Sequence, residues 1–235
     1  MYGAEFPDTV TIRPFSIRTE AILSGNMTAI EKMNAITLAV ASFGSVKFTA
    51  QELLIADQYF ILAVARSLTY GENYEFSTKC PSCDAVERVS LKVPEHLPVR
   101  VWDKTNPPKL SVKLPHTKDV VEWKYATVAD EQAVQQYEKS LRSAGGDGPA
   151  IDDMAYIRRM AKQIVSVNGG KPDDIAEADA YASSISGTDM ATLQDAITAN
   201  QPGIQYQWKV LCDKCNHKYD TFVPIAQDFF RRNRG

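Results

Sequence analysis

Residues 74–92, YEFSTKCPSCDAVERVSLK, and residues 206–223, YQWKVLCDKCNHKYDTFV, repeat one pattern at distant places in the chain. In each stretch a Cys-x-x-Cys pair separates two segments in which apolar and polar residues alternate, which is the pattern of a half-buried β-strand. Each stretch therefore predicts a strand, a tight turn that carries two cysteines, and a return strand. Together they predict a zinc ribbon whose two halves are split across the sequence.

We expect one structural Zn²⁺ ion to be bound by the four cysteines of the chain, Cys80, Cys83, Cys212 and Cys215. Two residues between thiolates let a tight turn direct both sulfurs at one cation, and two such turns complete a tetrahedral site. Asp84 and Asn216, which follow the second cysteine of each pair, belong to the residue types that tolerate a positive φ, and such a turn often needs one. Four protein ligands leave no open position, so a catalytic ion is not expected.

Three other readings of the cysteines compete with zinc. They are redox Cys-x-x-Cys motifs, two separate disulfides, and buried thiols without a ligand. Neither pair opens a helix after a buried strand, which disfavours the redox reading. His217 is close enough in sequence to replace a cysteine ligand, but we interpret it as a solvated strand residue.

The two cysteine pairs are separated by the 128 residues from 84 to 211, whereas a compact ribbon has about 15–20. Loop-closure entropy grows logarithmically with length, so the longer span costs roughly 2 kcal/mol more. Zinc binding to a structural site contributes on the order of 10–16 kcal/mol. The site is therefore expected to staple the N-terminal half of the chain to its C-terminal strands.

The remaining sequence predicts an α+β protein, with a mainly helical body, short antiparallel strands and a split four-cysteine zinc-ribbon element. Thr28 with Glu31, and Thr49 with Glu52, have capping-box spacing at the start of two helices, and Thr188 is a candidate cap for a later one. Apolar periodicity predicts helices at 18–24, 28–43, 49–68, 128–143, 151–166, 173–185, 188–199 and 225–233. Alternation predicts strands at 9–16, 73–79, 86–91, 110–114, 121–125, 204–211 and 218–223.

These elements divide the chain into three regions. Residues 1–95 form an N-terminal helical region with the first zinc knuckle. Residues 96–149 form an inserted β-hairpin and helix. Residues 150–235 contain C-terminal helices, the second zinc knuckle and a terminal helix. The Gly- and Pro-rich stretch 144–149 is the clearest flexible break.

The amino-acid composition disfavours several classes of protein, namely disordered, nucleic-acid-binding and membrane-spanning proteins. The 235 residues are 44% hydrophobic, which allows a sizeable core, and the net charge of −3 favours neither nucleic acid nor an anionic membrane. No apolar run approaches the roughly 18–20 residues that span a bilayer. The N-terminus lacks the pattern of a signal peptide, so we expect the protein to be made in a reducing cytosol, where paired thiols favour metal over disulfides.

Motifs for enzymatic chemistry are absent from the sequence, including phosphate-binding glycine loops, H-E-x-x-H and G-x-S-x-G. The carboxylate pairs Asp152–Asp153 and Asp173–Asp174 fall at predicted helix starts, where they complement the helix dipole. Around the knuckles, lysines and arginines are balanced by acidic residues, unlike a basic groove for nucleic acid. We therefore expect a protein that is not an enzyme.

Several segments resemble the T-even-like phage baseplate proteins: VTIRPFSIRTE (10–20), DQYFILAVARSLTYGENYEF (57–76) running into CPSC, SGTDMATLQDAITANQPGIQYQWKVLCDKC (186–215) and YDTFVPIAQDFFRR (219–232). The resemblance covers about residues 9–95 and 150–232. In the second knuckle, Asp213 and Asn216 replace the Pro and Gly that are common in the family. All four thiols are kept, so this departure leaves metal binding intact.

The resemblance implies a non-enzymatic structural subunit of a contractile phage tail baseplate, in its hub region. It implies a place in the virion, assembly in the bacterial host cytoplasm, and other baseplate and tail proteins as partners. No small-molecule substrate, nucleic acid or membrane is expected as a partner. Two alternatives stay open: a transient chaperone of hub assembly, and a zinc-ribbon nucleic-acid-binding protein.

Overall fold

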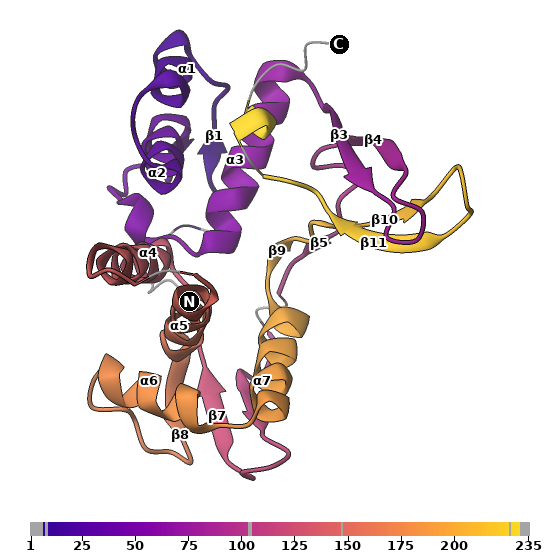
Figure 1. Ribbon diagram of the computed structural model, residues 1–235. Coiled ribbons are helices and arrows are strands. Elements are labelled where there is room, and N and C mark those ends of the chain that lie inside the picture. The colour runs from indigo at the N-terminus through magenta and orange to yellow at the C-terminus, as the bar shows by residue number, and fades with distance from the viewer. Residues whose placement is uncertain (1–6, 8, 103–104, 147, 226, 231–235) are drawn as a thin grey trace. The chain divides into compact units, whose positions relative to one another are not determined.

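The computed structural model describes residues 7, 9–102, 105–146, 148–225 and 227–230 (Figure 1). Within these ranges the fold is α+β, as predicted, with α-helices joined by short antiparallel strands. None of the described helices is both long and apolar enough to cross a membrane. The helices are α1 (Ile17–Ser24), α2 (Ala29–Val40), α3 (Ile55–Tyr70), α4 (Val128–Ser143), α5 (Pro149–Ala161), α6 (Ile175–Ser184) and α7 (Gly187–Asn200).

The strands form four two-stranded pairs, β1–β2, β3–β4, β5–β9 and β10–β11, and one three-stranded sheet in the order β6-β7-β8. Their bounds are β1 (Thr11–Ile12), β2 (Ala41–Ser42), β3 (Asn73–Lys79), β4 (Val86–Lys92), β5 (Val99–Arg100), β6 (Ser111–Lys113), β7 (Val120–Trp123), β8 (Ile164–Val167), β9 (Gly203–Ile204), β10 (Gln207–Leu211) and β11 (Lys218–Phe222). Two short 3₁₀ turns, η1 (Ala50–Glu52) and η2 (Gln227–Phe230), complete the set.

The chain folds into two compact units, and each unit contains pieces that are distant in sequence. Unit 1 is formed by residues 51–55 and 102–201. Unit 2 is formed by the described residues before 51, from 56 to 101 and from 202 onward. The three regions expected from the sequence, divided after residues 95 and 149, stay a prediction.

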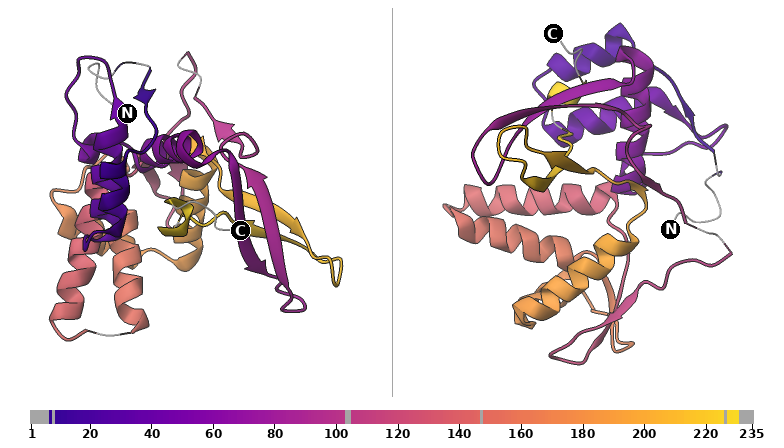
Figure 2. Two further views of the ribbon diagram at one scale, coloured as in Figure 1. Left: turned by 90° about the horizontal axis from the view of Figure 1, so that it is seen from above. Right: turned by 90° about the vertical axis from the view of Figure 1, so that its right-hand side faces the viewer.

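Unit 1 is built on the antiparallel sheet β6-β7-β8. Val121 in the central strand pairs with Val112 on one side and Val167 on the other, and it is fully buried. The predicted hairpin of residues 110–114 and 121–125 is thereby confirmed. Helices α4 and α5 pack side by side in both views of Figure 2, and α5 also packs on α6.

Helix α4 has the bounds that the sequence predicts, and its first turn explains why it begins there. The Thr127 side chain accepts the Asp130 N–H, and the Asp130 carboxylate accepts the Thr127 N–H, which completes a capping box. The Lys124 ammonium donates to the same carboxylate at 2.6 Å. Burial alone raises the pKa of Asp130, but the hydrogen bonds from Lys124 and Thr127 outweigh it and lower that pKa below its ordinary value.

Replacing Asp130 with asparagine should destabilise unit 1 by about 1 kcal/mol at neutral pH, because the charge-assisted bonds of the cap are lost. The folded-state pKa lies below that of the unfolded chain, so the charge stabilises above about pH 4 and this contribution disappears as the pH falls through the folded pKa. Urea unfolding of both proteins from pH 7 to pH 2 measures the difference.

The two unfolding curves should therefore converge in acid, and a difference that stays constant with pH would contradict the assignment. Asp152→Asn is a matched control, since its side chain is 69% exposed in its pair with Arg142. That substitution should change the stability by less than about 0.5 kcal/mol.

The helix predicted from 49 to 68 begins later than expected. Residues 50–52 form the turn η1, and α3 starts at Ile55. Between them the chain is extended and pairs with residues 126–128: the Val128 N–H donates to the Leu53 carbonyl, and the Ile55 N–H donates to the Ala126 carbonyl. Leu53 is fully buried. The backbone groups that a helical turn would use are thus taken by a distant segment of unit 1.

The helix predicted from 151 to 166 is wrong in its last turn. Helix α5 ends at Ala161, and Ile164–Val167 is strand β8. Ile164 pairs with Trp123, and Ser166 with Glu122. Three of the four β8 residues are β-branched, which favours a strand when a sheet edge is available.

Other boundaries differ by smaller amounts. The strand predicted at 204–211 is interrupted after β9, where the Tyr206 carbonyl accepts the Val223 N–H and the Tyr206 hydroxyl donates to the Tyr59 carbonyl. Ser186, rather than Thr188, caps α7. The helix predicted at 225–233 is wrong where it is described: residue 225 is not helical, and Gln227–Phe230 is the 3₁₀ turn η2. Residues 226 and 231–233 of that prediction lie outside the described residues. The capping box of Thr28 and Glu31 on α2 is confirmed.

The end of the described chain is buried in unit 2. The turn η2 lies against α3 in Figure 1, and Phe229 is fully buried, with Phe230 4% exposed. Arg66 of α3, itself 1% exposed, donates to the Phe229 carbonyl at 3.2 Å. This apolar pair therefore packs on the protein's own core.

Candidate metal centre

Two β-hairpins carry the cysteines. Strand β3 pairs with β4, β10 pairs with β11, and the hairpins lie side by side in Figures 1 and 2. The hydroxyls of Thr78 and Thr221, one from each hairpin, are 3.1 Å apart. Within each hairpin the last pair before the turn is Lys79 with Val86, and Leu211 with Lys218. The hairpins predicted from the sequence are confirmed, and their turns occupy equivalent places.

The two turns have the same backbone geometry. The Cys80 N–H donates to the Ala85 carbonyl and the Asp84 N–H to the Cys80 carbonyl, both at 2.9 Å. In the second turn the Cys212 N–H donates to the His217 carbonyl at 3.0 Å, and the Asn216 N–H to the Cys212 carbonyl at 2.9 Å.

A left-handed residue closes each turn, as predicted. The φ angle is 56° at Asp84 and 57° at Asn216. Asp and Asn tolerate this conformation better than other non-glycine residues. The local sequence of each knuckle therefore favours its turn geometry.

The four sulfurs converge on one point. Their Sγ atoms all lie within 4.8 Å of one another, and the distance is 3.6 Å both from Cys80 to Cys215 and from Cys83 to Cys212. A tetrahedron with metal–sulfur bonds of 2.3 Å has edges of about 3.8 Å. The arrangement thus fits four thiolate ligands around one ion, and the four cysteines could hold a metal.

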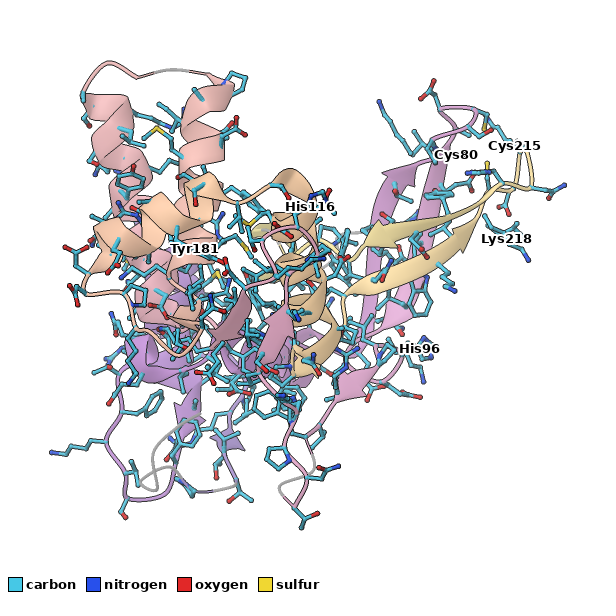
Figure 3. The ribbon with its side chains drawn as sticks, turned by 90° about the horizontal axis from the view of Figure 1, so that it is seen from below. Cys80, His96, His116, Tyr181, Cys215 and Lys218 are labelled. Atoms are coloured by element: carbon cyan, nitrogen blue, oxygen red, sulfur yellow. The ribbon has the colours of Figure 1, made fainter. Side chains whose placement is uncertain are left out.

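The site has a buried and an exposed side. Cys80 and Cys212, the first residue of each pair, are fully buried, whereas Cys83 and Cys215 are exposed. Ala85 packs with the two buried cysteines, and Tyr219 covers them. Figure 3 shows Cys80 and Cys215 together at the end of the two hairpins, with His96 much nearer their other end. The cluster therefore closes the tip of the ribbon.

Backbone hydrogen bonds and burial shift the pKa values of the thiols in opposite directions. The His217 N–H is the main cause that lowers the pKa of Cys215 to about 7, because it stabilises the thiolate. Burial, followed by the hydrogen bond to Glu87, raises the pKa of Cys212 to about 12. Cys215 is therefore much more readily deprotonated than Cys212.

Glu87 is a neighbour of the site that the sequence analysis did not single out. It is 8% exposed, and the Cys212 thiol donates to its Oε1 atom at 3.1 Å. The signal was present in the alternation of β4, since Glu87 shares a face with the buried residues Val89 and Leu91. Because successive side chains of a strand point to opposite faces, the sequence could have predicted that Glu87 faces inward.

The other candidates lie elsewhere. Among the described residues, the group that could hold a metal contains the four cysteines alone, so His217 is not part of it. His217 is exposed and stacks on Tyr219, with ring centroids 6.3 Å apart. Asp174 caps α6, and Asp152 pairs with Arg142 beside α5. Asp174 and Asp152 lie at the starts of their helices, as expected, whereas His217 precedes β11 and is not a strand residue.

Comparison with known proteins identifies one family. A family model described as T4 bacteriophage base plate protein matches residues 2–231, which is nearly the whole chain. Comparison with curated proteins and with solved structures gives no match.

Proposed function

Because the chain belongs to the family of T4 bacteriophage base plate proteins, we propose that it is a non-enzymatic structural subunit of the baseplate hub whose four cysteines bind one structural zinc ion. The family places the protein in the phage tail, among other tail proteins. The finer assignments, to the hub and to zinc, rest on the arguments that follow.

The sulfur geometry is the observation that supports zinc. Four thiolates within 4.8 Å of one another match the tetrahedral coordination that zinc adopts in structural sites. Thiolates are soft ligands, which disfavours magnesium and calcium. When bound, the ion would supply a cross-link between the two hairpins.

A closed site also supports a structural role. Four protein ligands leave no coordination position for water or substrate, so an ion here would hold the chain together rather than activate a reactant. The ligands come from residues 80–83 and 212–215, so the ion would tie parts of unit 2 that are far apart in sequence.

The ion pairs of the first hairpin disfavour nucleic acid as a partner. Arg88 pairs with Glu75, and Lys92 pairs with Glu95. Positive side chains that are already paired with carboxylates bind a phosphate backbone weakly. We propose other baseplate and tail proteins as partners instead, with assembly in the bacterial cytoplasm, where thiols stay reduced.

Purified tails should contain this chain as a stoichiometric component when they are measured by quantitative mass spectrometry. A transient assembly chaperone would be present in infected cells and absent from finished tails, so absence would contradict the structural role. A tail protein of known copy number in the same sample provides the control.

Cross-linking of the same tails tests the hub assignment. Cross-links from this chain should join proteins at the centre of the baseplate. Cross-links to peripheral proteins alone would contradict a place in the hub.

A further inference from the structure

We propose that the last described residues of the chain hold the two hairpins together at the end opposite the metal site, and that this packing strengthens zinc binding. We call the zinc site and this packing the two closures of the ribbon. We define the C-terminal strap as the described residues 224–225 and 227–230, which include Pro224, Phe229 and Phe230. This inference rests on the zinc assignment above and adds a pair of positioning residues, Arg66 and Phe229, to it.

Strand β3 joins the two closures. At its end, Lys79 leads directly into Cys80. At its beginning, the Tyr74 hydroxyl donates to the Pro224 carbonyl at 3.0 Å, and the Tyr74 ring lies 4.9 Å from that of Phe229 in an edge-to-face arrangement. The same strand therefore contacts the strap at one end and delivers a ligand at the other.

Strand β11 joins them from the other side. It begins at Lys218, three residues after the ligand Cys215, and it ends at Phe222, two residues before Pro224. At the strand pitch of about 3.3 Å per residue, these five residues separate the two closures by roughly 17 Å or more. The Thr78–Thr221 contact lies between them. Both closures thus bring together the same two stretches of chain.

Arg66 makes docking of the strap specific. Its guanidinium donates to three backbone carbonyls, those of Gly71 at 2.6 Å, Asn73 at 2.9 Å and Phe229 at 3.2 Å. It also lies over the rings of Tyr74 and Phe229. Desolvation lowers the pKa of this buried group, because burial disfavours the charged form. If the strap were released, Arg66 would lose its hydrogen bond to the Phe229 carbonyl and its contact with the Phe229 ring.

The zinc site and the docked strap join the same two stretches of chain, around β3 and around β11, so their formation is thermodynamically coupled. Once either closure has formed, the other closes a much shorter loop and loses less conformational entropy. Coupling between two sites is reciprocal and typically changes affinity by about 5- to 150-fold. Zinc at the tip therefore favours a docked strap, and a docked strap raises the affinity for zinc.

The test compares zinc dissociation constants, measured by competition with a chromophoric chelator, in the full chain and two variants. Phe229→Ala removes a fully buried ring from the strap, and zinc should bind about 5- to 150-fold more weakly. Leu193→Ala, in α7 of unit 1, removes an equally buried side chain that is not part of the ribbon, and its zinc affinity should stay within about twofold of the wild type.

A second measurement uses the wild type alone, in case Phe229→Ala does not fold. Removal of zinc by a chelator should speed hydrogen exchange in the strap and leave α4 of unit 1 unchanged. Phe229→Leu, which keeps an apolar side chain, should recover part of the zinc affinity.

The outcomes separate the two proposals. Zinc binding of equal affinity in the wild type and Phe229→Ala, or strap exchange that does not respond to zinc, would overturn the coupling and leave the zinc site intact. A wild-type protein that binds no zinc would overturn both.

Discussion

Replacing either Cys80 or Cys212 with serine should abolish zinc binding, so that the metal content falls from one ion per chain to near zero. Each substitution removes a fully buried ligand, and the remaining three thiolates come from both hairpins. Because structural zinc contributes on the order of 10–16 kcal/mol, its loss should unfold the ribbon. Elemental analysis of the purified protein measures the metal, and circular dichroism follows the strands.

Equal losses from the two substitutions are the informative result, since they would show that one ion is shared by the two knuckles. His217→Ala is the matched control, because His217 lies two residues from Cys215 and outside the candidate ligand group. Zinc content should be unchanged in that variant. Retention of zinc after Cys212→Ser but not after Cys80→Ser would contradict a shared site.

The competing disulfide hypothesis predicts a different result in the same experiment. The Sγ atoms of Cys83 and Cys212 are 3.6 Å apart, well beyond the roughly 2.0 Å of a disulfide. A chelator should therefore destabilise the wild type, whereas a thiol reductant alone should not. Destabilisation by the reductant without metal release would favour disulfides.

Replacing Arg66 with methionine should lower the unfolding free energy of unit 2 by about 1–3 kcal/mol, with zinc present at saturation. Methionine fills similar space but leaves the carbonyls of Gly71, Asn73 and Phe229 without this donor. The Phe229 carbonyl is buried, and a buried carbonyl that loses its partner costs about 1–3 kcal/mol, whereas Gly71 and Asn73 are exposed and water can reach their carbonyls. Urea unfolding followed by hydrogen exchange of β3 and β4, which lie in unit 2, measures the change.

Arg66→Lys should recover only a small part of this stability, because an ammonium cannot reproduce the planar fork that reaches three carbonyls. Arg88→Met is the matched control. Arg88 is 71% exposed in its pair with Glu75, so that variant should differ from the wild type by less than about 1 kcal/mol. A loss below about 1 kcal/mol for Arg66→Met would show that the three carbonyls find other partners.

The sequence predicted best where the signal was local. The cap of α2 lies in the four residues from Thr28 to Glu31, and the knuckles lie in the five residues that contain each cysteine pair and its left-handed residue. Such signals need only the geometry of one turn, so they keep their meaning in any tertiary context. The bounds of α4, Val128–Ser143, were predicted from apolar periodicity, which is also a property of neighbouring residues.

The predictions failed where a distant segment competed for the backbone. Residues 53–55 carry a helical pattern, yet they pair with residues 126–128. Ile164–Val167 continues the apolar period of α5, yet it adds a strand to β7. In both cases the alternative becomes available only when a partner more than 35 residues away is in place, and tertiary pairing then overrides local propensity.

The sequence by itself determined the α+β class, the two strand–knuckle–strand hairpins and the four cysteines as the candidate ligands, because spacing and alternation are properties of neighbouring residues. Only the tertiary structure decided that the sulfurs meet, that Glu87 lies beside Cys212, and that Arg66 holds the end of the described chain. These contacts join residues 125 to 163 positions apart in the cases of Glu87 with Cys212 and Arg66 with Phe229. The hydrophobic effect that brings such residues together is non-directional, so no local pattern encodes which of them will touch.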